Sequence, residues 1–135
     1  MDCIFCKIVS KEIPTTLVYE DAHAVAFLDI HPRAPGHTMV IPKMHAATLL
    51  ELPEREIGPL FGAVKAVAAK IERALAPDGF TIGVNHGDAS GQSVKHLHVH
   101  IIPRWKDDGG GSVHSVVHKP TDEPIASLET RIAAA

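Results

Sequence analysis

The chain has 135 residues, of which 45% are hydrophobic and 21% charged, and its formal net charge is −3. This length and composition predict one domain spanning residues 1–135. The slightly negative charge gives no electrostatic basis for binding nucleic acid or a membrane surface, and no apolar run approaches the ~20 residues of a membrane span. The first residues lack the basic and apolar regions of a signal peptide, so we expect a cytoplasmic protein.

Hydrophobic periodicity and breaker residues predict the elements in chain order. Five strands are expected, at 16–19, 24–28, 38–41, 80–85 and 97–103. Three helices are expected: a short one at 2–10, a long amphipathic one at 53–75 and a terminal one at 124–132. The last of these lies in a C-terminal tail, 106–135, that begins with a glycine-rich connection. Strands followed by one long helix and further strands predict an α+β fold with an antiparallel sheet.

The run at 96–102 alternates imidazole with branched aliphatic side chains. In a β-strand His96, His98 and His100 share one face, with about 6.6 Å between successive positions at roughly 3.3 Å per residue. The aliphatic residues between them then point into a core. Three imidazoles on one face suit a reaction surface better than packing, because histidine acts near neutral pH as nucleophile, acid, base or metal ligand.

A loop of small residues leads into this strand and ends with Gly91, Gln92 and Ser93. Glycine lets main-chain N–H groups approach a ligand closely, and a serine hydroxyl adds a donor, so such a loop suits an anion. An anion site beside an imidazole face indicates nucleophilic attack by a histidine nitrogen on phosphorus, with the loop donors holding the non-bridging oxygens.

The only two cysteines, Cys3 and Cys6, form a Cys-x-x-Cys motif near the N-terminus. Three interpretations are open: a redox pair, half of a zinc site, or chance. The redox motif usually follows a strand in a βαβ unit, which is not the context here. Zinc needs two more ligands, and histidine is the natural partner.

The chain resembles the histidine triad (HIT) family, in its Hint-like branch and in the bacterial type that starts with Cys-x-x-Cys. The segments that carry the resemblance are 2–13, 26–30, 36–45, 91–96 and the histidine run itself. The resemblance implies a five-stranded antiparallel sheet with one long helix and short terminal helices, and a two-fold homodimer whose sheets join. It also implies a hydrolase or transferase that cleaves purine nucleoside phosphoramidates or dinucleoside polyphosphates at the α-phosphate.

The resemblance assigns roles to individual residues of this chain. His98 would be the nucleophile that forms a nucleotidyl-histidine intermediate, His100 would bind the phosphate or leaving group, and His37 would line the same site. Asp29 would accept from the ribose hydroxyls, as an ionised carboxylate can do bidentately. The remaining nucleotide contacts would be Asn85, Gly91, Gln92 and Ser93 around the phosphate and Ile4, Phe5, Ile8, Ile13 and Ile30 around the base.

The same resemblance implies a structural zinc ion bound by Cys3, Cys6, His45 and His96. It would tie the N-terminal segment to the sheet, and it would make His96 unavailable as an acid or base. Two other functions stay open: a hydrolytic metal centre on the three strand histidines, and a non-catalytic purine-nucleotide sensor or adaptor. The residues do not distinguish an amine, a sulfate or a second nucleotide as the leaving group.

Overall fold

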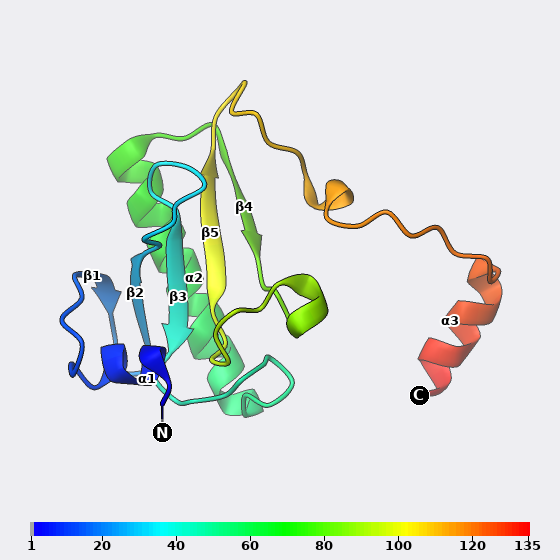
Figure 1. The fold of residues 1–135 in the computed structure, drawn as a ribbon, viewed down its shortest axis with the longest axis horizontal. Coiled ribbons are helices and arrows are strands. Elements are labelled where there is room, and N and C mark those ends of the chain that lie inside the picture. Colours follow the sequence, from blue (N-terminus) through cyan, green and yellow to red (C-terminus); the bar gives the residue numbers. More distant parts are fainter. Residues whose placement is uncertain (1) are drawn as a thin grey trace.

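The computed structural model describes residues 2–135 and contains one five-stranded sheet with helices on both sides (Figure 1). The helices are α1 (Ile4–Val9), α2 (Glu54–Leu75) and α3 (Ile125–Ala134), with short 3₁₀ turns at Asp88–Ser90 and Val113–Ser115. The strands are β1 (Leu17–Glu20), β2 (Ala24–Leu28), β3 (Thr38–Pro42), β4 (Gly79–Gly83) and β5 (Val99–Arg104). None of the helices in the described range is long and apolar enough to span a bilayer.

All neighbouring strands are antiparallel, in the order β1-β2-β3-β5-β4. The predicted α+β fold, with five antiparallel strands, one long helix and short terminal helices, is therefore confirmed. The pairing of two sheets across a dimer stays a prediction.

The long helix α2 covers one face of the sheet. Two glutamates lie in its first turn, where they favour the positive end of the helix dipole, and it ends at Ala76 in the left-handed conformation. Its buried residues recur at three- and four-residue steps and pack against inward-facing residues of β5. The α2 members of this core are Leu60, Ala63, Val64, Val67 and Ile71, and the β5 side contributes Leu97, Val99 and Ile101.

The opposite face carries α1 and a second, smaller core. It consists of Phe5, Ile8, Val25, Phe27, Met39 and Ile41. The alternation predicted for the histidine run is thus observed: its aliphatic residues face α2, and its imidazoles face the side where α1 lies.

Two strand boundaries differ by two residues from the sequence prediction, and the others agree to within one residue. The strand β4 ends at Gly83, so Asn85 lies in the loop beyond it, and β5 begins at Val99, so His96 and His98 precede the strand. The last residue pair between β3 and β5 is Val40 with Val99. The ladder stops there because β3 ends in a proline, which has no N–H to donate.

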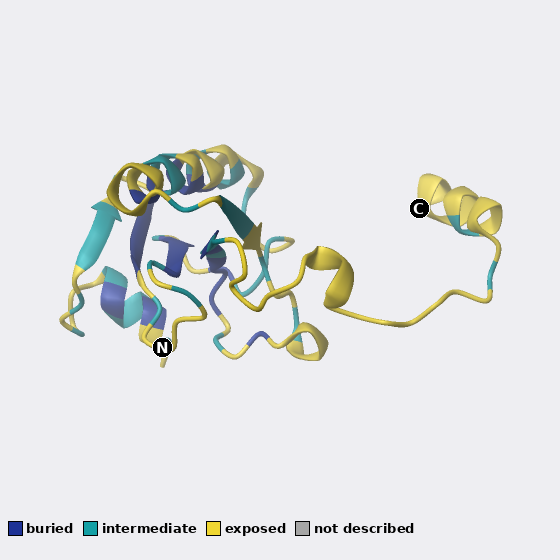
Figure 2. Ribbon diagram, turned by 90° about the horizontal axis from the view of Figure 1, so that it is seen from above, coloured by how far each residue is buried: buried dark blue, intermediate teal, exposed yellow. Residues whose placement is uncertain are grey.

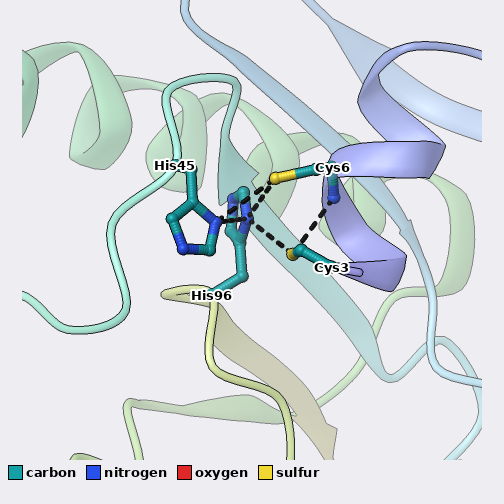
Figure 3. Close-up of side chains that lie close together, drawn as sticks. All are labelled: Cys3, Cys6, His45 and His96. Atoms are coloured by element: carbon teal, nitrogen blue, oxygen red, sulfur yellow. Dashed lines mark hydrogen bonds between the residues drawn. The ribbon is translucent and has the colours of Figure 1, made fainter. Parts of the chain in front are cut away.

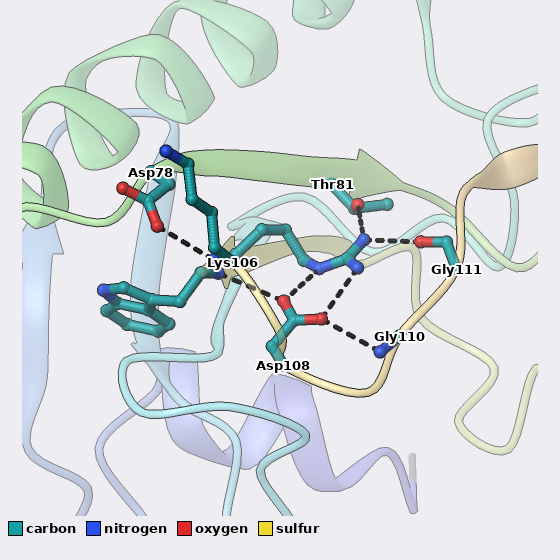
Figure 4. A network of polar contacts seen from close by, with 8 residues as sticks. Asp78, Thr81, Lys106, Asp108, Gly110 and Gly111 are labelled. Carbon is teal, nitrogen blue, oxygen red and sulfur yellow. Dashed lines mark hydrogen bonds and ion pairs between the residues drawn. The ribbon is translucent and has the colours of Figure 1, made fainter.

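The tail leaves the sheet at the end of β5 and carries α3 away from it (Figures 1 and 2). Its start is held by a network around Arg104 (Figure 4), whose guanidinium donates to both carboxylate oxygens of Asp108 at 2.7 and 3.0 Å. The same guanidinium donates to Thr81 Oγ1 at 3.0 Å and to the Gly111 carbonyl at 2.6 Å. Beyond this network α3 has no buried residue.

Candidate functional site

The middle histidine of the run, His98, is held in one tautomer. It is 6% exposed, and its Nδ1 lies 2.7 Å from the carbonyl oxygen of His96. A carbonyl accepts only, so the proton of the neutral ring is on Nδ1 and the lone pair is on Nε2. The ring packs edge-on against Phe5, with centroids 5.2 Å apart, and lies 5.0 Å from the ring of His100. A buried, oriented imidazole with a free Nε2 is equipped to act as a nucleophile.

A relay of hydrogen bonds sets the tautomer of His100. The main-chain N–H of Arg33 donates to His37 Nδ1 at 3.1 Å, so the proton of the neutral His37 ring is on Nε2. That Nε2 donates to His100 Nδ1 at 2.9 Å, which leaves the proton of His100 on its own Nε2. The carboxylate of Asp29 also lies 3.5 Å from His37 Nε2. The site therefore presents an acceptor on His98 beside a donor on His100.

Both rings of this relay stay neutral at physiological pH. Burial lowers the pKa of His100 to about 4, and the nearby His98 and His37 lower it further. Burial also lowers the pKa of His37, although the Asp29 carboxylate opposes this shift. The proton positions derived above for His37 and His100 therefore hold at physiological pH.

The loop before β5 is shaped by the side chain of Gln92. This amide is 5% exposed: its oxygen accepts from the N–H of Gly87 at 2.8 Å, and its nitrogen donates to the carbonyls of Ala47 and Val94 at 2.7 and 3.0 Å. An ion pair between Lys95 and Asp88 closes the same loop. The buried side chain of Gln92 thus holds the conformation of the loop through these three hydrogen bonds.

The other predicted phosphate contacts lie on the outer side of this loop. Gly91 adopts a left-handed φ of 93°, and it is exposed, as are Ser93 and Asn85. The histidines at 37 and 100 line a cavity of about 730 Å³ that Asn85 also borders. Of the loop itself, Ala89 and Ser90 border this cavity, whereas Ser93 borders a separate one beside Cys3 and His45.

The residues predicted around the base divide into two groups. Phe5 and Ile8 are buried in the smaller core, at 6% and 7% exposure, and Ile13 is partly buried against it. Ile4 and Ile30 are exposed, at 50% and 86%. The exposed pair has free apolar surface for a ligand, whereas Phe5 supports the ring of His98.

The four predicted metal ligands converge, although they come from α1, the segment after β3 and the segment before β5 (Figure 3). His45 Nδ1 and His96 Nδ1 lie 3.1 Å apart. Cys6 Sγ is 3.2 Å from His45 Nδ1 and 3.5 Å from His96 Nδ1, and Cys3 Sγ is 3.4 Å from His96 Nδ1. Ligand atoms around a tetrahedral zinc ion are about 3.3–3.8 Å apart, given bonds of about 2.0–2.3 Å. The measured separations lie at the short end of this range or slightly below it, so the cluster has about the size that a zinc site requires.

The chemistry of this cluster also fits a cation. His96 is completely buried, and its Nε2 donates to the Pro42 carbonyl at 2.9 Å, which leaves the Nδ1 lone pair facing the cluster. Burial and the adjacent Cys3 raise the pKa of the Cys6 thiol to about 11, since two thiolates side by side repel. A divalent cation removes this repulsion.

The geometry does not favour a hydrolytic metal on the three histidines of the run. Among the described residues, two groups have converging ligand atoms: the cysteine cluster, which includes His96, and a group of Asp29, His37 and His100. Neither contains all three triad histidines. In the second group the Nε2 atom of His37 that faces its neighbours carries a proton, so it is not a ligand in this tautomer.

Sequence reasoning missed several main-chain groups of the site. The N–H of Arg33 and the carbonyls of Pro42 and Ala47 orient His37, His96 and Gln92, respectively. A main-chain group carries no side-chain signature, so only the flanking breaker residues mark these segments as loops.

Comparisons with known proteins identify the family. Residues 10–107 match the family model described as the HIT domain. The chain is 37% identical to adenosine 5'-monophosphoramidase hnt1 of Schizosaccharomyces pombe, over 99% of this chain and 98% of that protein. It is 40% identical to adenylylsulfatase HINT3 of Arabidopsis thaliana, over 79% of this chain and 54% of that protein.

A solved structure gives the same result for the fold. The crystal structure of a member of the HIT family of proteins from Bacillus subtilis superposes with a TM-score of 0.86 at 39% identity. The superposition covers 99% of this chain and 94% of that one. The chain belongs to the HIT domain family.

Proposed function

We propose that the protein is a nucleotide hydrolase or transferase that acts at the α-phosphate of purine nucleoside phosphoramidates or dinucleoside polyphosphates. The observation that carries this proposal is the hydrogen bond of 2.7 Å from His98 Nδ1 to the His96 carbonyl. In the neutral ring it leaves the lone pair on Nε2, which is the nucleophilic atom. Relatives named as a phosphoramidase and an adenylylsulfatase support the same class of reaction.

The reaction has two steps on this nitrogen. His98 Nε2 attacks the α-phosphorus, the new N–P bond forms, and the bond to the leaving group breaks as that group takes a proton from water. The ring of the resulting nucleotidyl-histidine is cationic, and its Nδ1–H still donates to the His96 carbonyl, which stabilises the charge. Water then attacks phosphorus, releases the nucleoside monophosphate and restores the neutral ring.

Neighbouring groups complete the proposed site. The Nε2–H of His100 donates to the phosphate or to the departing atom, and His37 holds that proton in place through their 2.9 Å hydrogen bond. Loop donors near Gly91 and Ser93 bind the non-bridging oxygens. Asp29 already accepts from the N–H of His31 at 2.8 Å, and its remaining lone pairs are assigned to the ribose hydroxyls.

We also propose a structural zinc ion at Cys3, Cys6, His45 and His96, where it would tie α1 to the sheet. When bound, zinc supplies cross-linking of three separate segments. Chelation should therefore lower the melting temperature, and zinc should restore it, as calorimetry with and without chelator would measure. An unchanged melting temperature after verified metal removal would contradict the assignment.

The oligomeric state proposed here is a two-fold homodimer whose sheets join. The position of β4 at a sheet edge supports this, since an edge strand has unpaired main-chain groups. Analytical ultracentrifugation would decide between this dimer and a monomer.

The test of the proposed chemistry is a turnover panel of adenosine phosphoramidates, adenylyl sulfate and diadenosine polyphosphates, with trapping of the intermediate by mass spectrometry. We expect a nucleotidyl adduct on His98, and loss of turnover in His98→Ala with retained binding of AMP. His23→Ala is the matched control, because His23 pairs with Glu56 outside the site. Wild-type turnover by His98→Ala would reject the mechanism. Binding of AMP without turnover of any substrate would instead indicate a nucleotide sensor.

A further inference from the structure

We propose that His96 links the metal site to the nucleophile, because its ring faces the metal ligands while its carbonyl holds the proton of His98. This inference rests on the proposed function, since it concerns the residues that orient the nucleophile. It makes His96 a positioning residue. It predicts that metal occupancy sets the reactive tautomer of His98 and not only the stability of the fold.

The link runs through one peptide unit, the one between His96 and Leu97. Its carbonyl accepts from His98 Nδ1 at 2.7 Å, and its N–H donates to the Ala46 carbonyl at 2.8 Å. The hydrogen bonds that hold His98 therefore join two segments, and each contains a metal ligand. One segment contains His96, and in the other Ala46 directly follows His45.

The β-ladder does not hold this peptide unit. The ladder between β3 and β5 ends at the pair Val40 and Val99, so His96 and His98 lie before the first paired residue of β5. The peptide unit is held by the Leu97 N–H, by the buried Leu97 side chain and by the ring of His96. That ring has no exposed surface, and both of its nitrogens are engaged, so it cannot turn without losing a contact.

A second contact couples the same two sites. The ring of Phe5 packs edge-on against His96 and His98, with centroid distances of 6.0 and 5.2 Å. Phe5 lies immediately before the ligand Cys6 on α1. A metal that holds Cys6 therefore also holds the phenyl ring that flanks the nucleophile.

Metal loss should loosen this arrangement in a defined way. Without a cation, four ligand atoms within 4.8 Å of one another lose their shared partner, and the segment that carries the His96 carbonyl loses one of the contacts that hold it. Once the hydrogen bond from Nδ1 is broken, His98 populates the other tautomer, in which Nε2 carries the proton and cannot attack. By analogy with residues that orient metal ligands, kcat should fall about 10- to 100-fold, while the KM changes less because the loop donors are untouched.

Imidazole tautomers can be measured directly in ¹⁵N-labelled protein. Long-range ¹H–¹⁵N spectra distinguish Nδ1–H from Nε2–H, and amide spectra of the same sample report whether the sheet stays folded. We expect His98 to be a single Nδ1–H tautomer in the zinc-loaded protein and a mixture after chelation. A folded, metal-free protein that keeps the single Nδ1–H tautomer and its kcat would overturn the proposal.

The variant His45→Ala keeps the test decisive if the metal-free protein unfolds. His45 is an exposed ligand, so the substitution should weaken zinc binding while retaining the buried ring of His96. In a zinc titration with binding followed by calorimetry, the fraction of His98 in the Nδ1–H tautomer and kcat should both rise as the zinc site fills. Met44→Ala, an exposed neighbour outside the cluster, should behave as wild type.

The outcomes separate this inference from the proposed function. Loss of kcat without a change of tautomer would place the metal in the chemistry itself and overturn the link. Wild-type turnover by His98→Ala would overturn the proposed function, while the tautomer measurement would still decide whether metal and ring are coupled.

Discussion

Acidification should destabilise the fold through His100, whose pKa is lowered from the ordinary 6.5 to about 4 by burial and by the nearby His98 and His37. In the unfolded chain this ring protonates near 6.5. Between these two values the unfolded state binds more protons, so acid favours unfolding. A difference of one pKa unit between the folded and unfolded states corresponds to about 1.36 kcal/mol. The contribution of His100 to the free energy of unfolding at neutral pH is therefore about 3 kcal/mol at most, since solvent reaches part of the ring and weakens the effect. It is fully present above 6.5 and lost as the pH falls to 4.

The assay is urea unfolding, followed by circular dichroism, at neutral pH and at about pH 4.5. Wild type is compared with His100→Asn, which removes the titrating ring, and with His118→Asn in the exposed tail as the matched control. We expect the loss of unfolding free energy on acidification to be smaller in His100→Asn by most of that amount, and unchanged in His118→Asn. Equal losses in wild type and His100→Asn would refute the reasoning.

Three further substitutions test other parts of the structure. Gln92→Ala removes a buried amide and leaves its three partly buried hydrogen-bond partners unpaired, so urea unfolding should show a loss of about 2–3 kcal/mol; an unchanged stability would contradict the role of this amide. Gly36→Ala should cost about 1–2 kcal/mol, because φ is +84° and the new Cβ would lie 2.5 Å from a Leu75 atom; Gly58→Ala, with open space around it, is the control. Arg104→Ala removes the hydrogen bonds of the guanidinium in Figure 4 and should speed limited proteolysis of the glycine-rich connection without lowering the melting temperature of the core.

Periodicity predicted α2 and β5 well because each has one buried side. The stripe of α2 and the alternation along β5 both follow from a single core between helix and sheet. The ends of β4 and β5 were predicted less well. The length of a strand depends on the strand that pairs with it. Pro42 at the end of β3 ends the ladder with β5, and the sequence of the histidine run contains no signal of this.

The site was predictable in its members more than in its proton positions. The spacing of the run predicted three imidazoles on one face. That the two cysteines share a metal site with His45 and His96 was predicted only from the family resemblance. The tautomers of His37 and His98 depend on the Arg33 N–H and the His96 carbonyl. These are main-chain groups brought close by the fold, which every residue possesses and no motif marks.

The three histidines of the run share one side chain, yet their hydrogen bonds give each ring a different reactive atom. On His96 the nitrogen that carries the lone pair is Nδ1, since Nε2 donates to Pro42, and it faces two sulfurs. On His98 the free nitrogen is Nε2, since Nδ1 donates to the carbonyl of His96. On His100 Nδ1 accepts from His37, so Nε2 offers a proton instead of a lone pair. The three roles, metal ligand, nucleophile and proton donor, thus follow from the main-chain or ring partner of each imidazole. Replacing one of these partners would change the role of that histidine, although the histidine itself stayed the same.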